Sequence, residues 1–212
     1  MSDARAADRA AAERLIDVSR ETWARLDALV AALDRWQAKT NLVAPNTLDE
    51  IWTRHVADSA QLVAPAPANP KRWVDIGSGG GFPGLVIAAM LAGRTAVHLV
   101  ESNGKKAAFL REAARAMGVT VVVHAERAEK ALAGLSADVV SARALAPLTA
   151  LLGLAAPLLK TGAVGLFPKG REASTELTEA EKSWRFRASL HPSLTDEHAR
   201  IVRVETFDGP AG

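Results

Sequence analysis

The stretch DIGSGGGFPG, residues 75–84, joins an apolar strand pattern to a helical one. The run RWVDIG reads as a buried strand, and Phe82–Leu91 reads as a helix that tolerates Pro83 in its first turn. Glycine at such a junction permits a tight turn and lets a ligand approach the backbone closely. The stretch therefore indicates a ligand-binding loop. Its key glycines are Gly77, Gly79, Gly81 and Gly84.

Downstream of this loop, strand and helix patterns alternate to the end of the chain. Further strands are predicted at TAVHLVES, VTVVVHA, ADVVSAR, AVGLFPK, WRFRASL and ARIVRVETF, and helices at residues 103–117, 127–132, 146–159 and 173–182. Such alternation predicts an α/β, Rossmann-like domain with a mostly parallel seven-stranded sheet and helices on both faces. The last two strands have no helix between them, so we expect them to pair antiparallel.

The N-terminal part has a helical texture. Residues 6–38 show one helical periodicity, and a second helix is predicted to start at Thr47, where TLDE has the form of a capping box. The segment PAPANP, residues 65–70, then interrupts regular structure. We expect an N-terminal helical cap at residues 1–64, a linker at 65–71 and the α/β domain at 72–212.

Composition restricts the class of protein. The chain has 212 residues, which suits one main domain, and its 49% hydrophobic content is enough for a core. It has no cysteine, which excludes disulfides, thiolate metal sites and thiol nucleophiles, and we identify no other metal site. There is no apolar run of about 18 residues, and the charged N-terminus lacks a secretory core. A cytoplasmic monomer without a membrane segment is expected.

The residues of the glycine loop restrict the kind of ligand that it can bind, because they favour a positively charged group over a phosphate. Residues 79–84 match the dinucleotide pattern, but Pro83 removes a backbone amide and Asp75 would repel a pyrophosphate. S-adenosylmethionine fits better, because it carries an ammonium, a sulfonium and a ribose but no phosphate. Glu101 ends the second strand about 20 residues beyond Gly81, where an acid can accept both ribose hydroxyls. Glu129 follows the third strand and either lines the adenine or is an ordinary acid of a helix first turn.

Several segments in order resemble one family. They are WQAKTNLVAP (36–45), RHVADSAQL (54–62), DIGSGGGFPGLVIA, VESNGKKAAFL, ERAEKAL, VVSARALAPL and FPKG. Through these segments the chain resembles the RsmG (GidB) family, the guanine-N(7) methyltransferases of bacterial 16S ribosomal RNA. The resemblance extends from about Leu26 to Val204. The resemblance implies a class I S-adenosylmethionine-dependent methyltransferase fold with an N-terminal helical extension. It also implies that the substrate is a guanine in the 530 loop of 16S RNA. That RNA is expected to be the partner either by itself or within the small subunit or an assembly intermediate.

Resemblance and residue chemistry together define an expected cofactor site. The resemblance implies contacts from Gly77, Phe82, Ala128, Glu129 and Arg143. The full expected set is Asp75, Gly77, Gly79, Gly81, Phe82, Glu101, Ala128, Glu129 and Arg143, in which Asp75 serves the ammonium directly or through water.

The chemistry is compatible with N7 methylation. Without cysteine, methylation of cytosine carbon 5 by the usual route is excluded, and SARALAP after the fourth strand does not match the motif of exocyclic-amine methyltransferases. Guanine N7 has a lone pair and no proton, so catalysis can rest on positioning without a general base. No catalytic residue is obvious. Candidates for positioning are Arg143, His55 and Asn41, although His55 could equally be a packed, hydrogen-bonded core residue.

Basic residues at strand ends are candidates for RNA contact. Lys105, Arg127 and Lys169 are expected on one rim, although such residues could also form an ordinary solvated face. The net charge of +2 means that any RNA surface is a local patch. The alternatives are a methyltransferase for a small molecule or protein, a nicotinamide-dependent oxidoreductase, and a non-catalytic RNA-binding module.

Overall fold

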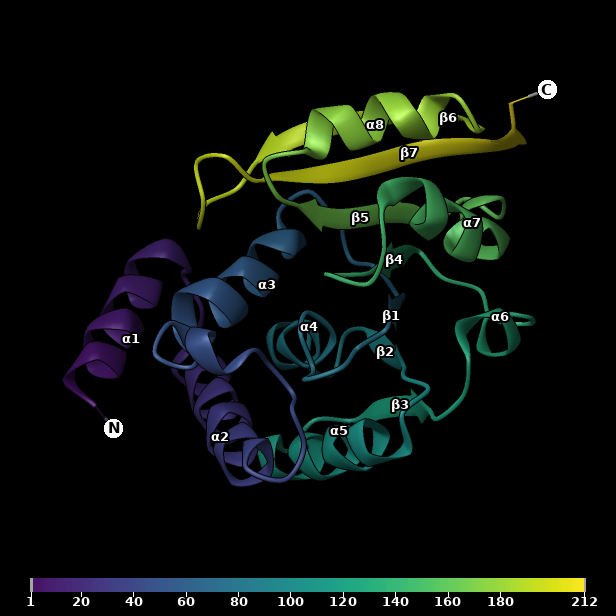
Figure 1. Ribbon diagram of the computed structural model, residues 1–212. Helices are drawn as coiled ribbons and strands as arrows, with labels where there is room; N and C mark the ends of the chain where they lie inside the picture. The colour runs from purple at the N-terminus through teal and green to yellow at the C-terminus, as the bar shows by residue number, and fades with distance from the viewer. Residues whose placement is uncertain (1, 212) are drawn as a thin grey trace.

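The computed structural model describes residues 2–211, which form a seven-stranded sheet between two layers of helices (Figure 1). The strand order is β3-β2-β1-β4-β5-β7-β6, in which β7 is antiparallel to both neighbours and the other pairs are parallel. This confirms the predicted sheet and its antiparallel final pair. The strands are β1 (Arg72–Ile76), β2 (Ala96–Val100), β3 (Val121–His124), β4 (Val139–Ser141), β5 (Val164–Lys169), β6 (Trp184–Pro192) and β7 (Arg200–Pro210).

The order of the strands reverses between β1 and β4, and ligands of open α/β sheets bind beyond the carboxyl ends of the strands at such a point. Adjacent strand residues point to opposite faces. Trp73 therefore packs with one helical layer and Val74 with the other. The helices of the α/β part are α4 (Gly84–Met90), α5 (Gly104–Met117), α6 (Ala128–Ala131), α7 (Leu148–Leu159) and α8 (Ala173–Glu181).

The single N-terminal helix expected at residues 6–38 is wrong, because the chain forms two helices, α1 (Asp3–Leu15) and α2 (Arg20–Gln37). Between them Ile16 is extended and buried, and the hydroxyl of Ser19 accepts from the Thr22 amide and so caps α2. The cap at Ser19 marks the break between the two helices.

The helix expected to begin at a Thr47 capping box is also wrong. Thr47 ends a 3₁₀ turn, η1 (Pro45–Thr47), and its hydroxyl donates to the Ala44 carbonyl at 2.7 Å. The next segment, η2 (Ile51–Ala57), is a π-helix whose first amides are capped from another helix: Asp8 of α1 accepts from the Trp52 amide at 2.8 Å. Two short turns follow, α3 (Asp58–Ala60) and η3 (Gln61–Val63).

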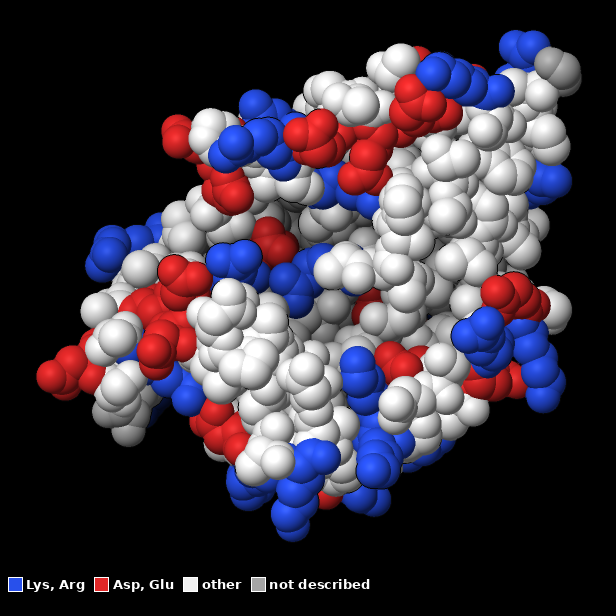
Figure 2. Space-filling model, in the orientation of Figure 1, with Lys and Arg blue, Asp and Glu red and all other residues white. Residues whose placement is uncertain are grey.

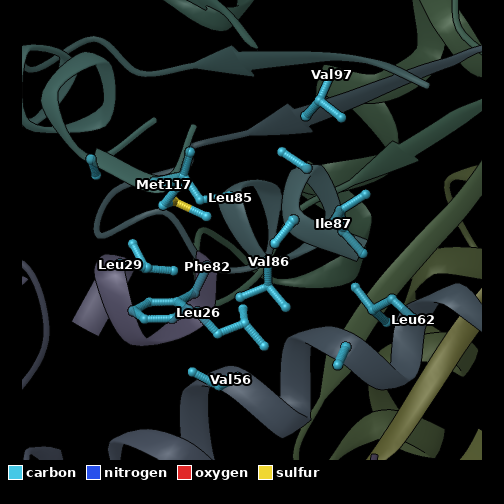
Figure 3. Packing of buried hydrophobic residues seen from close by; sticks show 14 of the residues in the cluster. Leu26, Leu29, Val56, Leu62, Phe82, Leu85, Val86, Ile87, Val97 and Met117 are labelled. Atoms are coloured by element: carbon cyan, nitrogen blue, oxygen red, sulfur yellow. The ribbon is translucent and has the colours of Figure 1, made fainter. Parts of the chain in front are cut away.

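Helices α2 and α3 pack on α4, the helix that follows the glycine loop, whereas α1 packs on η2. Figure 3 shows Leu26 and Leu29 of α2, together with Val56 and Leu62, around Phe82 and the side chains of α4. This continuous cluster places the N-terminal segments beside the loop. The boundaries at 1–64, 65–71 and 72–212 stay a prediction. Within residues 2–211, none of the helices combines the length and the apolar character needed to cross a membrane.

Candidate active site

The glycine loop between β1 and α4 has a backbone that favours glycine. Gly77, Gly79 and Gly81 have φ values of 71°, 50° and 87°, which side-chain-bearing residues rarely adopt. The Gly77 amide donates to the Val100 carbonyl at 2.8 Å and so ties the loop to the end of β2. A Cβ at Gly77 would lie 2.8 Å from Cδ1 of Leu145. The loop is thus tightly turned, and it is bare where the chain after β4 approaches it.

A cavity of about 370 Å³ opens at the carboxyl ends of β1, β2 and β4, and we call it the glycine-loop cavity. Its volume lies in the range of small-molecule sites. The cavity brings together six of the expected cofactor residues: Gly77, Gly79, Glu101, Ala128, Glu129 and Arg143. The other lining residues are Ile76, Val100, Ser102, Lys106, Glu126, Arg127, Ala144, Leu145 and Leu154. Sequence reasoning missed most of this second group.

Glu101 is fixed in the wall of this cavity by two backbone amides. Its Oε2 accepts from Gly79 at 2.9 Å and its Oε1 from Asn103 at 2.8 Å. The side chain is largely buried, so the carboxylate orientation is set before any ligand arrives. Each oxygen keeps a further lone pair, and this capacity suits a pair of ribose hydroxyls.

Asp75 lies beneath the glycine loop, outside the surface of the cavity. It is fully buried; Oδ1 accepts from the Ser141 hydroxyl at 2.8 Å and Oδ2 from the Gly84 amide at 3.2 Å. Burial raises the pKa of Asp75 to about 6, although these hydrogen bonds act in the opposite direction. The carboxylate thus ties β1 to β4 and to the start of α4, and the expectation that it serves the ammonium directly or through water stays a prediction.

Gly81 and Phe82 also lie behind the cavity. The backbone of Gly81 turns the loop, and Phe82 is buried with its ring centroid 5.1 Å from that of His55. The guanidinium carbon of Arg143 lies 5.6 Å from the same Phe82 ring. Gly81 therefore shapes the loop, and Phe82 supports the side chains of His55 and Arg143.

A second cavity, of about 660 Å³, adjoins the first, and we call it the outer cavity. Figure 2 shows a hollow on this face of the molecule, with basic and acidic side chains around it. Both cavities are lined by Arg143, Ala144 and Leu145, so they meet at the chain after β4. The other lining residues are Glu50, Thr53, Arg54, Asp58, Gln61, Ala146, Pro168, Lys169, Gly170, Glu176, Ser193, Thr195, Asp196, Ala199, Arg200 and Ile201.

Arg143 and His55 form a hydrogen-bonded pair where the cavities meet. Nη2 of Arg143 donates to Nδ1 of His55 at 2.8 Å, which assigns the imidazole proton to Nε2 and directs it to Oγ1 of Thr47, also at 2.8 Å. Burial, helped by Arg143 and Arg54, lowers the pKa of His55 to about 3. His55 is therefore a packed, neutral histidine that also orients Arg143.

The remaining candidates are divided between the two cavities and the surface. Arg127 lines the glycine-loop cavity, and Lys169 lines the outer cavity. Nζ of Lys169 is bound to the Ala146 carbonyl at 2.7 Å and to Glu176 at 2.8 Å. Lys105 and Asn41 are exposed and line neither cavity. Arg127, Lys169 and Lys105 thus do not line one common cavity, and their contact with RNA stays a prediction.

Comparison with known proteins agrees with this arrangement. The family model described as "GidB: rRNA small subunit methyltransferase G" matches residues 22–202. A protein named "Ribosomal RNA small subunit methyltransferase G" from Methylorubrum populi is 56% identical over 194 residues, covering 90% of this chain and 92% of that protein. One of the same name from Rhodopseudomonas palustris is 56% identical over 204 residues, covering 94% and 86%.

Solved structures support the fold alone. A putative O-methyltransferase from Klebsiella pneumoniae has a TM-score of 0.62 at 17% identity, covering 95% of this chain and 96% of that one. The cofactor-bound protein Rv0187 from MTB has a TM-score of 0.58 at 17% identity, covering 97% and 98%.

A methyltransferase family on this fold implies S-adenosylmethionine as the cofactor. The glycine-loop cavity fits this molecule, because it combines a bare Gly77, the fixed carboxylate of Glu101 and apolar walls at Val100 and Leu154. The oxidoreductase alternative has no support from these relatives. The chain belongs to the family of small-subunit ribosomal RNA methyltransferases G.

Proposed function

We propose that the chain methylates N7 of a guanine in the 530 loop of 16S ribosomal RNA. The observation that carries this proposal is the state of His55 beside the meeting point of the two cavities. Both of its ring nitrogens are hydrogen-bonded and its pKa is lowered to about 3, so it is not available to take a proton from the acceptor. N7 of guanine carries a lone pair and no proton, and it needs no such base.

The cofactor side of the reaction follows from the glycine-loop cavity. Glu101 accepts from the ribose hydroxyls, while Ala128 and Glu129 line the adenine. Gly77 and Gly79 let the backbone approach the methionine end, and Arg143 closes the side toward the outer cavity. Asp75, Gly81 and Phe82 contribute indirectly, by holding the loop in its turned form.

The acceptor side follows from the outer cavity, which meets the first at Arg143. S-adenosylmethionine held by the residues of the glycine-loop cavity would supply a methyl group on a positively charged sulfur, and N7 of the acceptor base would have to stand in line with that group. The protein holds the acceptor base in line and excludes water, and no covalent link to the chain forms. Such positioning is worth roughly 7–11 kcal/mol of the barrier.

RNA is held by basic groups around the cavities. We propose that Arg127 and Lys105 contact phosphates, and that Lys169 contributes when its ion pair with Glu176 is exchanged for RNA. Binding should weaken steeply with salt, because each neutralised phosphate releases counterions. The chain is proposed to act as a monomer in the cytoplasm, away from membranes, where small subunits are assembled.

A methyl-transfer assay tests this function. Purified protein and methyl-labelled S-adenosylmethionine are incubated with small subunits from cells that lack this modification, and labelled nucleosides are identified by mass. We expect label in 7-methylguanosine of the 530 loop. Label in a different nucleoside would overturn the N7 assignment. Absence of label in RNA, with intact binding of S-adenosylhomocysteine, would favour a small-molecule or protein acceptor.

A further inference from the structure

Asp58 and Arg143 stand side by side on the wall of the outer cavity. Oδ2 of Asp58 lies 3.4 Å from Nη1 of Arg143, and the two side chains are 16% and 17% exposed. Arg143 also lines the glycine-loop cavity, so the pair stands where an acceptor base must enter to reach a bound methyl donor.

The carboxylate of Asp58 is oriented through one of its oxygens. Oδ1 accepts from Nε2 of Gln61 at 2.8 Å and from Oγ1 of Thr195 at 2.9 Å, which uses its acceptor capacity. Within residues 2–211, Oδ2 has only the long contact to Arg143. Oδ2 is therefore held in place with acceptor capacity to spare.

Arg143 does not depend on Asp58 for its placement. Its guanidinium donates to Nδ1 of His55 at 2.8 Å and to the Arg54 carbonyl at 3.1 Å, and both contacts are shorter than the one to Asp58. Among the described residues, its Nε–H and one hydrogen of Nη2 have no partner. The pair thus presents a spare donor beside a spare acceptor.

We infer that this pair reads the target guanine, with Arg143 donating to O6 and Oδ2 of Asp58 accepting from N1–H. The inference rests on the proposed guanine acceptor. On a guanine ring, N7, O6 and N1–H follow one another along the edge, so N7 faces the glycine-loop cavity when Arg143 and Asp58 hold the next two groups. Adenine has a donor at position 6 and an acceptor at N1, so both contacts would fail.

The same contact stabilises the transition state. Transfer of a methyl group to N7 makes the base cationic and its N1–H more acidic, so the hydrogen bond to the Asp58 carboxylate strengthens as the reaction proceeds. The carboxylate also offsets the charge of the neighbouring Arg143, which would otherwise oppose a cationic product. Asp58 is thereby both a specificity-determining and a catalytic residue.

Base analogues test the inference on the unaltered protein. Small-subunit RNA is prepared with guanosine, inosine, adenosine or 1-methylguanosine at the target position. Inosine keeps O6 and N1–H, so its kcat/KM should stay within about tenfold of guanosine. Adenosine and 1-methylguanosine lack the N1–H donor, so their kcat/KM should be lower than that of guanosine by on the order of 10³-fold. Efficient methylation of adenosine, or rejection of inosine as severe as that of adenosine, would overturn the inference.

The variant Asp58→Asn gives an independent test. The donors Gln61 and Thr195 keep the amide oxygen at the Oδ1 position, so the amide nitrogen faces N1–H as a second donor. We expect kcat/KM for guanosine to fall about 100-fold, while calorimetry shows S-adenosylhomocysteine affinity unchanged within about twofold. Asp208→Asn removes the same charge from an exposed position on β7 and serves as the control.

A binding measurement separates the possible failures. With S-adenosylhomocysteine present, wild-type protein should bind guanosine RNA more tightly than adenosine RNA, and Asp58→Asn should lose this preference. If wild-type protein makes 7-methylguanosine and Asp58→Asn does so equally well, the reading role of Asp58 is wrong and the proposed function stands. If wild-type protein makes no 7-methylguanosine, the proposed function itself fails.

Discussion

The hydroxyl of Ser141 donates to the carboxylate of Asp75 at 2.8 Å, in the middle of the sheet and beneath the glycine loop. The same Ser141 oxygen accepts from Nε1 of Trp73 at 2.9 Å, so β1 and β4 are joined by a buried polar chain. Burial outweighs these hydrogen bonds and raises the pKa of Asp75 to about 6. The stability of the folded glycine loop therefore depends on whether the carboxyl group of Asp75 is protonated.

The free energy of unfolding should report this proton. The native carboxyl of Asp75 stays protonated up to about pH 6, whereas an unfolded aspartate loses its proton near pH 4. Between these values the native state binds more protons, so stability falls as pH rises. When the pH is lowered from 7 to 4, the free energy of unfolding of the wild type should rise by about 2–3 kcal/mol relative to that of Asp75→Asn. Urea denaturation at several pH values measures this; parallel curves for both proteins would contradict it.

His55 should have the opposite effect on stability. Its native pKa is about 3 and its ordinary value is 6.5, so below pH 6.5 the unfolded state binds more protons and stability is lost as pH falls. At pH 4 this loss should reach about 3 kcal/mol, and His55→Gln should remove it. Denaturation of both proteins at pH 7 and 4 gives the comparison, in which the contribution of Asp75 cancels. An equal acid sensitivity of the two would mean that His55 is charged in the native state.

Gly77→Ala should impair cofactor binding more than it impairs folding. Gly77 and Gly93 have similar φ values, 71° and 74°, but a Cβ meets Leu145 at the first and nothing within 4 Å at the second. Both alanine variants should lose about 1 kcal/mol of stability. Only Gly77→Ala should weaken S-adenosylhomocysteine binding, by about tenfold or more, since its methyl group would displace Leu145 in the wall of the glycine-loop cavity. Calorimetry that gives the two variants equal affinities would contradict a ligand role for Gly77.

Glu101→Gln should weaken the binding of S-adenosylhomocysteine by replacing a hydrogen-bond acceptor with a donor, without a change of side-chain size. The carboxylate accepts from the amides of Gly79 and Asn103, and a glutamine would place an N–H opposite one of them. We expect a loss of about 10- to 100-fold in S-adenosylhomocysteine affinity, from this mismatch and from a weaker ribose contact. Glu181→Gln on the exposed end of α8 is the charge-matched control. Wild-type affinity in Glu101→Gln would exclude the ribose assignment.

Features that depend on neighbouring residues could be predicted from the sequence. The strand pattern, the glycine loop and the Gly118 end of α5 follow from local periodicity and backbone preference. Features that depend on distant partners could not. Asp8 caps η2 from 44 residues away, and the hydroxyl of Thr47 is engaged by the Ala44 carbonyl and by His55 instead of by a capping box. Asp75 meets Ser141 across 66 residues, and nothing in the local sequence shows that this carboxylate is turned inward.

The same division explains the candidate site. Glycines and a strand-end acid have local signatures, and the cavity contains Gly77, Gly79 and Glu101 as expected. The pair of Asp58 and Thr195 joins residues 137 positions apart, and it could be seen only after folding. Leu145 was missed because an exposed leucine after a strand has no distinctive pattern.

The two cavities draw on different lengths of the chain. The glycine-loop cavity uses residues between Ile76 and Leu154, whereas the outer cavity also needs Gln61 and the segment from Ser193 to Ile201. The segment from Ser193 to Ile201 therefore contributes to the wall of the outer cavity alone, and a change of sequence there would alter the acceptor side while every residue that lines the glycine-loop cavity stays the same.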